Sequence, residues 1–165
     1  MVRVEDLARD LVTRLTEAGS TLATAESLTG GTLGGLITEV PGASAVYRGG
    51  VVAYATELKV ALLGVAEDLV DEFGVLSAEC AEAMASGVRS AAGSTYALST
   101  TGVAGPDRQD GLPPGTVYVG WCGPQGTGAR RLDLSGDRGT IRRETCRSAM
   151  TMLLDILAEE ETALG

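Results

Sequence analysis

The sequence Thr24-Ala25-Glu26-Ser27-Leu28-Thr29-Gly30-Gly31 joins a short apolar run to a helical pattern, and this junction indicates the fold class. The apolar run ends in Glu-Ser, and Thr-Gly-Gly then leads into the next helix. A serine at such a strand-to-helix turn has a free hydroxyl and neighbouring backbone N–H groups without a helical partner. A nucleophile beside an oxyanion or phosphate cradle has the same features. We therefore treat this turn as the candidate active site, although a simple helix cap could have the same local sequence.

Helical and strand patterns alternate along the whole chain. Helices are predicted from Val4 to just before Gly19 and over residues 32–40, 57–63, 67–73, 78–92 and 140–158, with Thr56 and Ser77 as caps of the third and fifth. Strands are predicted over residues 21–25, 50–55, 96–101, 116–122 and 129–134, the last two as a hairpin. This order predicts an α/β protein, a three-layer α/β/α sandwich with a mixed, mostly parallel sheet.

The composition suits one globular domain over residues 1–165, because 44% of the residues are hydrophobic and 21% are charged. With 22 acidic and 13 basic residues the net charge is −9, so we expect no binding to nucleic acid or to a membrane. We expect no signal peptide, since charges run through the first residues. The three cysteines, Cys80, Cys122 and Cys146, have neither disulfide nor metal-ligand spacing, which favours a reducing cytoplasm.

The chain contains no histidine, so the commonest general base is missing. A base must then be a lysine, a tyrosine, a carboxylate or water. Lys59 is the only lysine of the chain, and arginine has too high a pKa to act as a base. We therefore predict that Ser27 pairs with Lys59 or with nearby Tyr54. The alternatives are a solvated helix lysine and a half-buried strand aromatic.

Polar or glycine-rich turns follow several predicted strands. Ser27, Tyr54 with Lys59, the Thr100-Thr101-Gly102 turn and the Gly136-Asp137-Arg138 turn all occupy such places. Ligands of open α/β sheets bind at the carboxyl ends of the strands. We expect one shared cleft there, with the glycine- and proline-rich segment 102–114 as a functional loop.

Two sets of charged residues have more than one interpretation. Arg138 and Arg142 lie one helical turn apart at the start of the last helix, where cations oppose the helix dipole unless an anion such as phosphate binds. A solvated helix face is the alternative. Glu26 either orients Lys59 or, on an alternating strand, faces away from Ser27 and caps another element.

Seven motifs, in this order, resemble the C-terminal domain of the competence/damage-inducible protein CinA family: TAESLTGG, VPGAS, GGVVAYATELKVALLGV, the serine of GVLS, STTGVAGP, PPGTV and SGDRGTIRRE. Stand-alone members of that family are nicotinamide mononucleotide deamidases. The resemblance implies a five-stranded mixed sheet, no metal or other cofactor, and self-association into a dimer or higher oligomer. It also implies a small-molecule nucleotide as the substrate.

The resemblance implies hydrolysis of the carboxamide of nicotinamide mononucleotide to nicotinate mononucleotide and ammonia, in pyridine nucleotide recycling. Its catalytic residues fall on Ser27, Tyr54 and Lys59. We expect Lys59 to take the Ser27 proton, directly or through Tyr54, and N–H groups around Thr29 to Gly31 to hold the oxyanion. The residues expected to bind substrate are Glu26, Thr29, Gly30, Gly31, Gly49, Gly50, Thr101, Gly102, Gly105, Arg138 and Arg142.

The segment from Asp107 to Pro113 departs from the family pattern, in which a glycine-rich loop with Glu and Lys often stands at this place. Two other functions remain open. One is a non-catalytic nucleotide- or phosphate-binding regulatory domain, and the other is an amidase for a different small amide.

Overall fold

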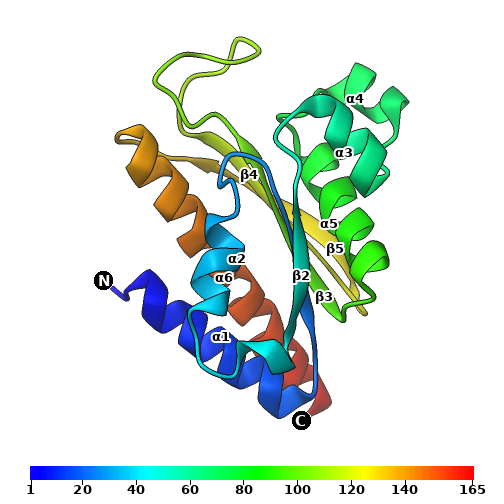
Figure 1. Cartoon of the computed structure of the whole chain (residues 1–165), viewed down its shortest axis with the longest axis vertical. Coiled ribbons are helices and arrows are strands. Elements are labelled where there is room, and N and C mark those ends of the chain that lie inside the picture. Colours follow the sequence, from blue (N-terminus) through cyan, green and yellow to red (C-terminus); the bar gives the residue numbers. More distant parts are fainter.

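The computed structural model describes all 165 residues, and its centre is one five-stranded sheet (Figure 1). The strands, in the order β2-β1-β3-β4-β5, are β1 Leu22–Glu26, β2 Tyr47–Val52, β3 Tyr96–Gly102, β4 Thr116–Gly123 and β5 Gly126–Asp133. The mixed five-stranded sheet is therefore confirmed.

The sheet is not mostly parallel, and that part of our prediction is wrong. β1 runs parallel to β2 and β3, whereas β3 with β4 and β4 with β5 are antiparallel. A parallel connection needs a crossover, usually through a helix. The chain instead returns from β3 to β4 through residues 103–115, which contain no helix.

Helices cover both faces of the sheet (Figure 1). They are α1 Val4–Ala18, α2 Thr32–Thr38, α3 Thr56–Leu63, α4 Glu67–Phe73, α5 Ala78–Ala92 and α6 Arg138–Leu164, with a short 3-10 turn at Ala43–Ala45. Helices α1, α2 and α6 lie on one face and α3, α4 and α5 on the other. None of the helices has both the length and the apolar character needed to cross a membrane.

Local chemistry sets most of the helix ends. Helix α1 ends at Gly19, whose φ of 65° is the left-handed conformation that glycine adopts without a steric penalty. Ser77 caps α5 as predicted, because its Oγ accepts a hydrogen bond from Cys80 N at 3.1 Å. Thr56 is not a cap: it is the first helical residue of α3, and the preceding Ala55 makes no side-chain cap bond. Helix α6 starts earlier than predicted, because Asp137 Oδ1 accepts from Thr140 N at 2.8 Å.

The alternation of β1 divides its residues between two cores. Leu22 packs in the core under α1, α2 and α6, whereas Ala23 and Ala25 pack under α3 to α5. Side chains of a strand alternate between its faces. Glu26 therefore turns toward α2, and Ser27 toward α3.

Candidate active site

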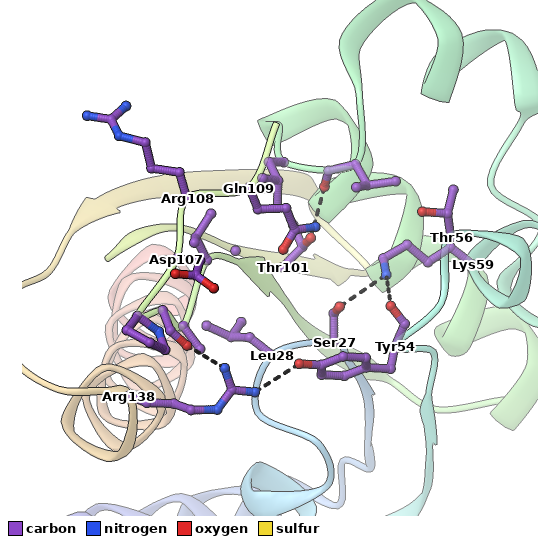
Figure 2. A pocket seen from close by; sticks show the side chains of 17 residues that line it. Ser27, Leu28, Tyr54, Thr56, Lys59, Thr101, Asp107, Arg108, Gln109 and Arg138 are labelled. Carbon is purple, nitrogen blue, oxygen red and sulfur yellow. Dashed lines mark hydrogen bonds between the residues drawn. The ribbon is translucent and has the colours of Figure 1, made fainter. Parts of the chain in front are cut away.

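Ser27 and Lys59 meet at the carboxyl end of β1 (Figure 2). Ser27 N–H donates to Thr100 O at 3.0 Å, which holds the residue beside β3 just beyond the strand. Lys59 belongs to the first turn of α3 and is only 1% exposed. Its Nζ lies 3.0 Å from Ser27 Oγ, so the structure brings together the two side chains that the sequence paired.

The surroundings of the Lys59 amine favour its neutral form. Its Nζ donates to Ala53 O at 2.7 Å and to Tyr54 O at 3.2 Å. Burial is the main influence on the group and lowers the pKa of Lys59, while the charges of Cys80 and Glu57 oppose this shift. A neutral amine has two N–H groups and one lone pair. The charged amine can donate to both carbonyls and to Ser27 Oγ. Once it loses a proton, its two N–H groups can stay on the carbonyls and its lone pair then faces the Ser27 hydroxyl, which is the arrangement of a general base and its nucleophile.

The phenol of Tyr54 makes no hydrogen bond to Ser27 or to the Lys59 amine. Its side chain is 58% exposed, and its hydroxyl accepts a hydrogen bond from Arg138 Nη2 at 3.0 Å (Figure 2). Only the main-chain carbonyl of Tyr54 contacts the Lys59 amine. The structure therefore supports the direct proton transfer of our two alternatives, and not the relay through the tyrosine hydroxyl.

A pocket of about 360 Å³ opens over the Ser27–Lys59 pair. Thr101, Gly102, Gly105 and Arg138 line it, so the turns after β1, β2 and β3 and the start of α6 do share one cleft. Thr101 Oγ1 donates to Val75 O at 2.8 Å, and Arg138 Nη1 donates to Gly105 O at 2.6 Å. These contacts tie the pocket wall to α6 and to the segment that precedes α5.

Gly102 forms part of this wall because β4 passes close behind it. A Cβ at this position would lie 2.7 Å from Thr116 O and from Val117 Cα. Any larger residue would push the strand end away from β4. The glycine thus permits close packing of β3 and β4 beneath the pocket.

The segment that departs from the family pattern, residues 107–113, lies on the pocket wall. Asp107, Arg108 and Gln109 all line the pocket, although the Arg108 guanidinium points away from it and donates to Gly111 O at 3.0 Å (Figure 2). The Gln109 and Leu112 backbones exchange hydrogen bonds of 3.1 and 2.9 Å around Asp110 and Gly111, both with positive φ. We did not predict this turn, although an Asp-Gly pair is a strong hairpin indicator.

Glu26 faces away from Ser27, as one of our two alternatives predicted. The side chain is 2% exposed and binds the N-terminal turn of α2. Its Oε1 accepts from Thr29 Oγ1 at 2.7 Å, Gly31 N at 3.1 Å and Leu33 N at 2.9 Å, and its Oε2 accepts from Gly34 N at 3.0 Å. Glu26 does not line the pocket, so it anchors the turn instead of contacting a ligand.

Because Glu26 binds N–H groups of the turn, the backbone N–H groups that remain free for an oxyanion are not all the ones we expected. Gly30 N–H donates to Ser27 O at 3.0 Å and Gly31 N–H donates to Glu26, so neither group is free. The N–H groups of Leu28 and Thr29 have no partner in the protein. Leu28 lines the pocket, whereas Thr29 is fully buried and does not, so Leu28 N–H is the free donor at the pocket beside Ser27. Gly30 and Gly31, which we also expected to contribute, offer no free N–H in this structure.

Arg142 does not lie at the pocket, where we expected it, and binds the turn between Ser27 and α2 instead. Its Nε donates to Leu28 O at 2.9 Å, and its Nη2 donates to Thr29 O at 2.9 Å and Thr32 Oγ1 at 3.1 Å. The residue does not line the pocket. Of the two arginines expected to hold phosphate, only Arg138 faces the cavity.

Gly49 and Gly50 lie within β2, away from the pocket. A Cβ on Gly50 would come within 2.5 Å of both Thr24 Oγ1 and Tyr47 Oη. Those two oxygens hydrogen-bond to each other at 2.6 Å. Gly50 therefore makes room for a buried contact, and neither glycine is placed to touch a ligand. No group of three or more cysteine, aspartate or glutamate side chains is arranged so that it could hold a metal ion.

Comparisons with known proteins give the family. The model of the CinA C-terminal domain matches residues 4–157. A CinA-like protein of Frankia casuarinae is 51% identical over 144 residues, which are 87% of this chain and 33% of that protein. A putative competence-damage inducible protein of Geobacillus kaustophilus is 43% identical over 94% of this chain and 38% of its own length. The chain thus spans about a third of the length of these relatives.

Solved structures agree with this assignment. A CinA superfamily protein of Klebsiella pneumoniae superposes with a TM-score of 0.93 at 30% identity, over 96% of this chain and 99% of that one. A competence/damage inducible protein of Agrobacterium tumefaciens gives a TM-score of 0.89 at 34% identity, over 92% and 94%. The chain belongs to the CinA C-terminal domain family.

Proposed function

We propose that this protein hydrolyses the carboxamide of nicotinamide mononucleotide, releasing ammonia and nicotinate mononucleotide. The observation that carries the proposal is the 3.0 Å contact between Lys59 Nζ and Ser27 Oγ at the pocket. Membership of a family that includes nicotinamide mononucleotide amidases supports it.

The first half of the reaction forms an acyl-enzyme. Lys59 accepts the Ser27 hydroxyl proton as Oγ attacks the amide carbon, and the carbonyl oxygen becomes an oxyanion. The free N–H group of Leu28 stabilises that charge; one such donor is typically worth about 3 kcal/mol. The Lys59 ammonium then protonates the amide nitrogen, the C–N bond breaks, and ammonia leaves.

The second half returns the enzyme to its starting state. Neutral Lys59 takes a proton from a water molecule, whose oxygen attacks the ester carbon. The new tetrahedral intermediate collapses with loss of Ser27 Oγ, to which Lys59 returns the proton. The product leaves as the carboxylic acid and loses its proton to solvent to become the carboxylate. The same two residues serve both halves of the reaction.

Arg138 is the residue we assign to the phosphate. It is the cation whose guanidinium is held on the pocket wall, by Gly105 O and the Tyr54 hydroxyl. Arginine donors match phosphate oxygens well. Because the whole chain carries a charge of −9, an anionic substrate needs such a local cation to bind. Tyr54 contributes its phenol to the same wall.

The deciding experiment compares three amides: nicotinamide mononucleotide, nicotinamide riboside and free nicotinamide. We expect ammonia release to be fastest from the mononucleotide and to need no added metal or cofactor. No release from any of them would favour a non-catalytic nucleotide-binding domain. Equal release from all three would favour an amidase for another small amide.

We also propose that the protein self-associates, which light scattering tests.

A further inference from the structure

The turn between Ser27 and α2 is held on two sides by charged side chains outside the pocket. The Glu26 carboxylate accepts four hydrogen bonds of 2.7 to 3.1 Å, and every partner is a donor. The Arg142 guanidinium makes three hydrogen bonds of 2.9 to 3.1 Å, and every partner is an acceptor. One side chain thus binds N–H groups of the turn, and the other binds its carbonyl oxygens.

This division determines which backbone donors stay free. Ser27 N–H is used by Thr100, Gly30 N–H by Ser27 O, and Thr32 N–H by Thr29 O. The N–H groups of Gly31, Leu33 and Gly34 bind Glu26. Among the residues from 27 to 34, only Leu28 and Thr29 keep an unpaired N–H, and Arg142 holds the carbonyl oxygens of these same two residues.

Two threonine hydroxyls also link the backbone N–H of Ser27 to Glu26. Ser27 N lies 3.3 Å from Thr100 Oγ1, which is 2.8 Å from Thr29 Oγ1, which donates to Glu26. All of these residues are buried. Buried hydrogen-bonded networks fix one conformation, because an alternative geometry would leave a charge or a polar group unpaired.

We infer that Glu26 and Arg142 are positioning residues that hold the Leu28 N–H group, the free donor at the pocket, in place for the oxyanion. The inference rests on the proposed function, because only acyl transfer creates the oxyanion. Donors fixed before the reaction act without reorganisation, and a displacement of about 1 Å can lower a rate on the order of 100-fold. Neither residue needs to touch the substrate for its loss to slow the chemical step.

The test uses Glu26→Gln and Arg142→Met, each with a matched control. Thr24→Val removes a buried hydrogen bond on the same face of β1 without touching the turn. Arg143→Met removes the neighbouring arginine of α6, which binds the side chain of Glu5 instead of the turn. Should Glu26→Gln not fold, Arg142→Lys keeps the charge but loses the forked contact to Leu28 O and Thr29 O.

Two readouts are measured: ammonia release from nicotinamide mononucleotide, and the affinity for pyridine-3-boronic acid. In the boronate adduct Ser27 Oγ bonds to boron, its proton passes to Lys59, and the boron becomes tetrahedral and anionic, as the oxyanion intermediate is. We expect kcat and boronate affinity to fall on the order of 100-fold in both turn variants. KM should stay within twofold of the wild type. The pH midpoint of the rate should shift by no more than about 0.3 unit, which is a twofold change in the acid dissociation constant.

The inference is overturned if kcat and boronate affinity stay within threefold of wild type in both turn variants. It is also overturned if Thr24→Val, at an equal loss of melting temperature, loses as much of both. A wild-type protein that binds the boronate but releases no ammonia contradicts the proposed function instead. The boronate affinities of the variants then decide the inference by themselves.

Discussion

Lys59 Nζ lies 3.0 Å from Ser27 Oγ and within 3.2 Å of two backbone carbonyl oxygens, with no carboxylate in an ion pair with it. Helix α3 supplies the amine, and the residue after β1 supplies the hydroxyl. In a chain without histidine, this contact is the source of the base chemistry that we assign.

The pH dependence of the rate follows from the lowered pKa of Lys59. Only the neutral amine accepts the serine proton, so kcat/KM should rise with pH through that pKa and then level off. An ordinary lysine has a pKa near 10.4. Because burial lowers the pKa of Lys59, the rise should be complete at a lower pH than it would be for such a lysine. A pH–rate profile for nicotinamide mononucleotide checks this. A midpoint at or above the ordinary lysine value would contradict it.

Replacing the amine changes how stability depends on pH. In the wild type, the unfolded chain binds more protons at residue 59 than the folded chain, from the lowered pKa up to the ordinary one. The free energy of unfolding therefore gains from this group as pH rises, by about 1.4 kcal/mol per unit of pKa lowering. Lys59→Met lacks the gain. Urea unfolding from pH 6 to pH 10 should show the free energy of unfolding of the wild type rising relative to that of Lys59→Met. A difference that stays constant with pH would contradict the account.

Arg138→Met should raise KM for nicotinamide mononucleotide about 10- to 100-fold, with a smaller effect on kcat. Hydrogen bonds to charged groups contribute about 1.5 to 3 kcal/mol, which corresponds to that range. Nicotinamide riboside has no phosphate, so its KM should change little. Arg143→Met on the same helix is the control. Equal effects of Arg138→Met on both substrates would mean that this arginine does not bind the phosphate.

Ser77→Ala should cost about 1 kcal/mol in the free energy of unfolding, since it removes the cap of α5. For a chain of this length, that loss lowers the melting temperature by roughly 2 to 4 °C. The turnover rate should not change, because Ser77 does not line the pocket. Ser90→Ala, an exposed substitution on the same helix, should leave stability nearly unchanged; a similar loss there would show that the cap is not the cause.

The sequence allowed most elements to be placed, because local chemistry ends them. Gly19 ends α1 through its left-handed conformation, and Ser77 begins α5 through its side-chain hydrogen bond. The Ser27–Lys59 pair could be predicted because the chain has no histidine and a single lysine. The direction of β4 could not be predicted, since a loop rich in glycine and proline permits either orientation. The mostly parallel sheet was expected from the alternation of helices and strands alone.

The roles of Arg142 and Tyr54 were not visible in the sequence for a related reason. Arg142 binds backbone oxygens of Leu28 and Thr29, residues more than 110 positions away. Tyr54 contacts the lysine through its main chain and turns its phenol to Arg138. Such contacts depend on where distant carbonyls lie after folding. A pattern of residue types marks a charge as available, but it does not identify the backbone group that the charge will bind.

The central claim is that Ser27, activated by Lys59, is the nucleophile. Its most direct test is the rate of ammonia release from nicotinamide mononucleotide by Ser27→Ala, compared with the wild type. The substitution removes the attacking oxygen and leaves the free N–H groups in place, so we expect kcat to fall by at least about 1000-fold with the fold intact. A Ser27→Ala protein that keeps a kcat within tenfold of the wild type would contradict the account.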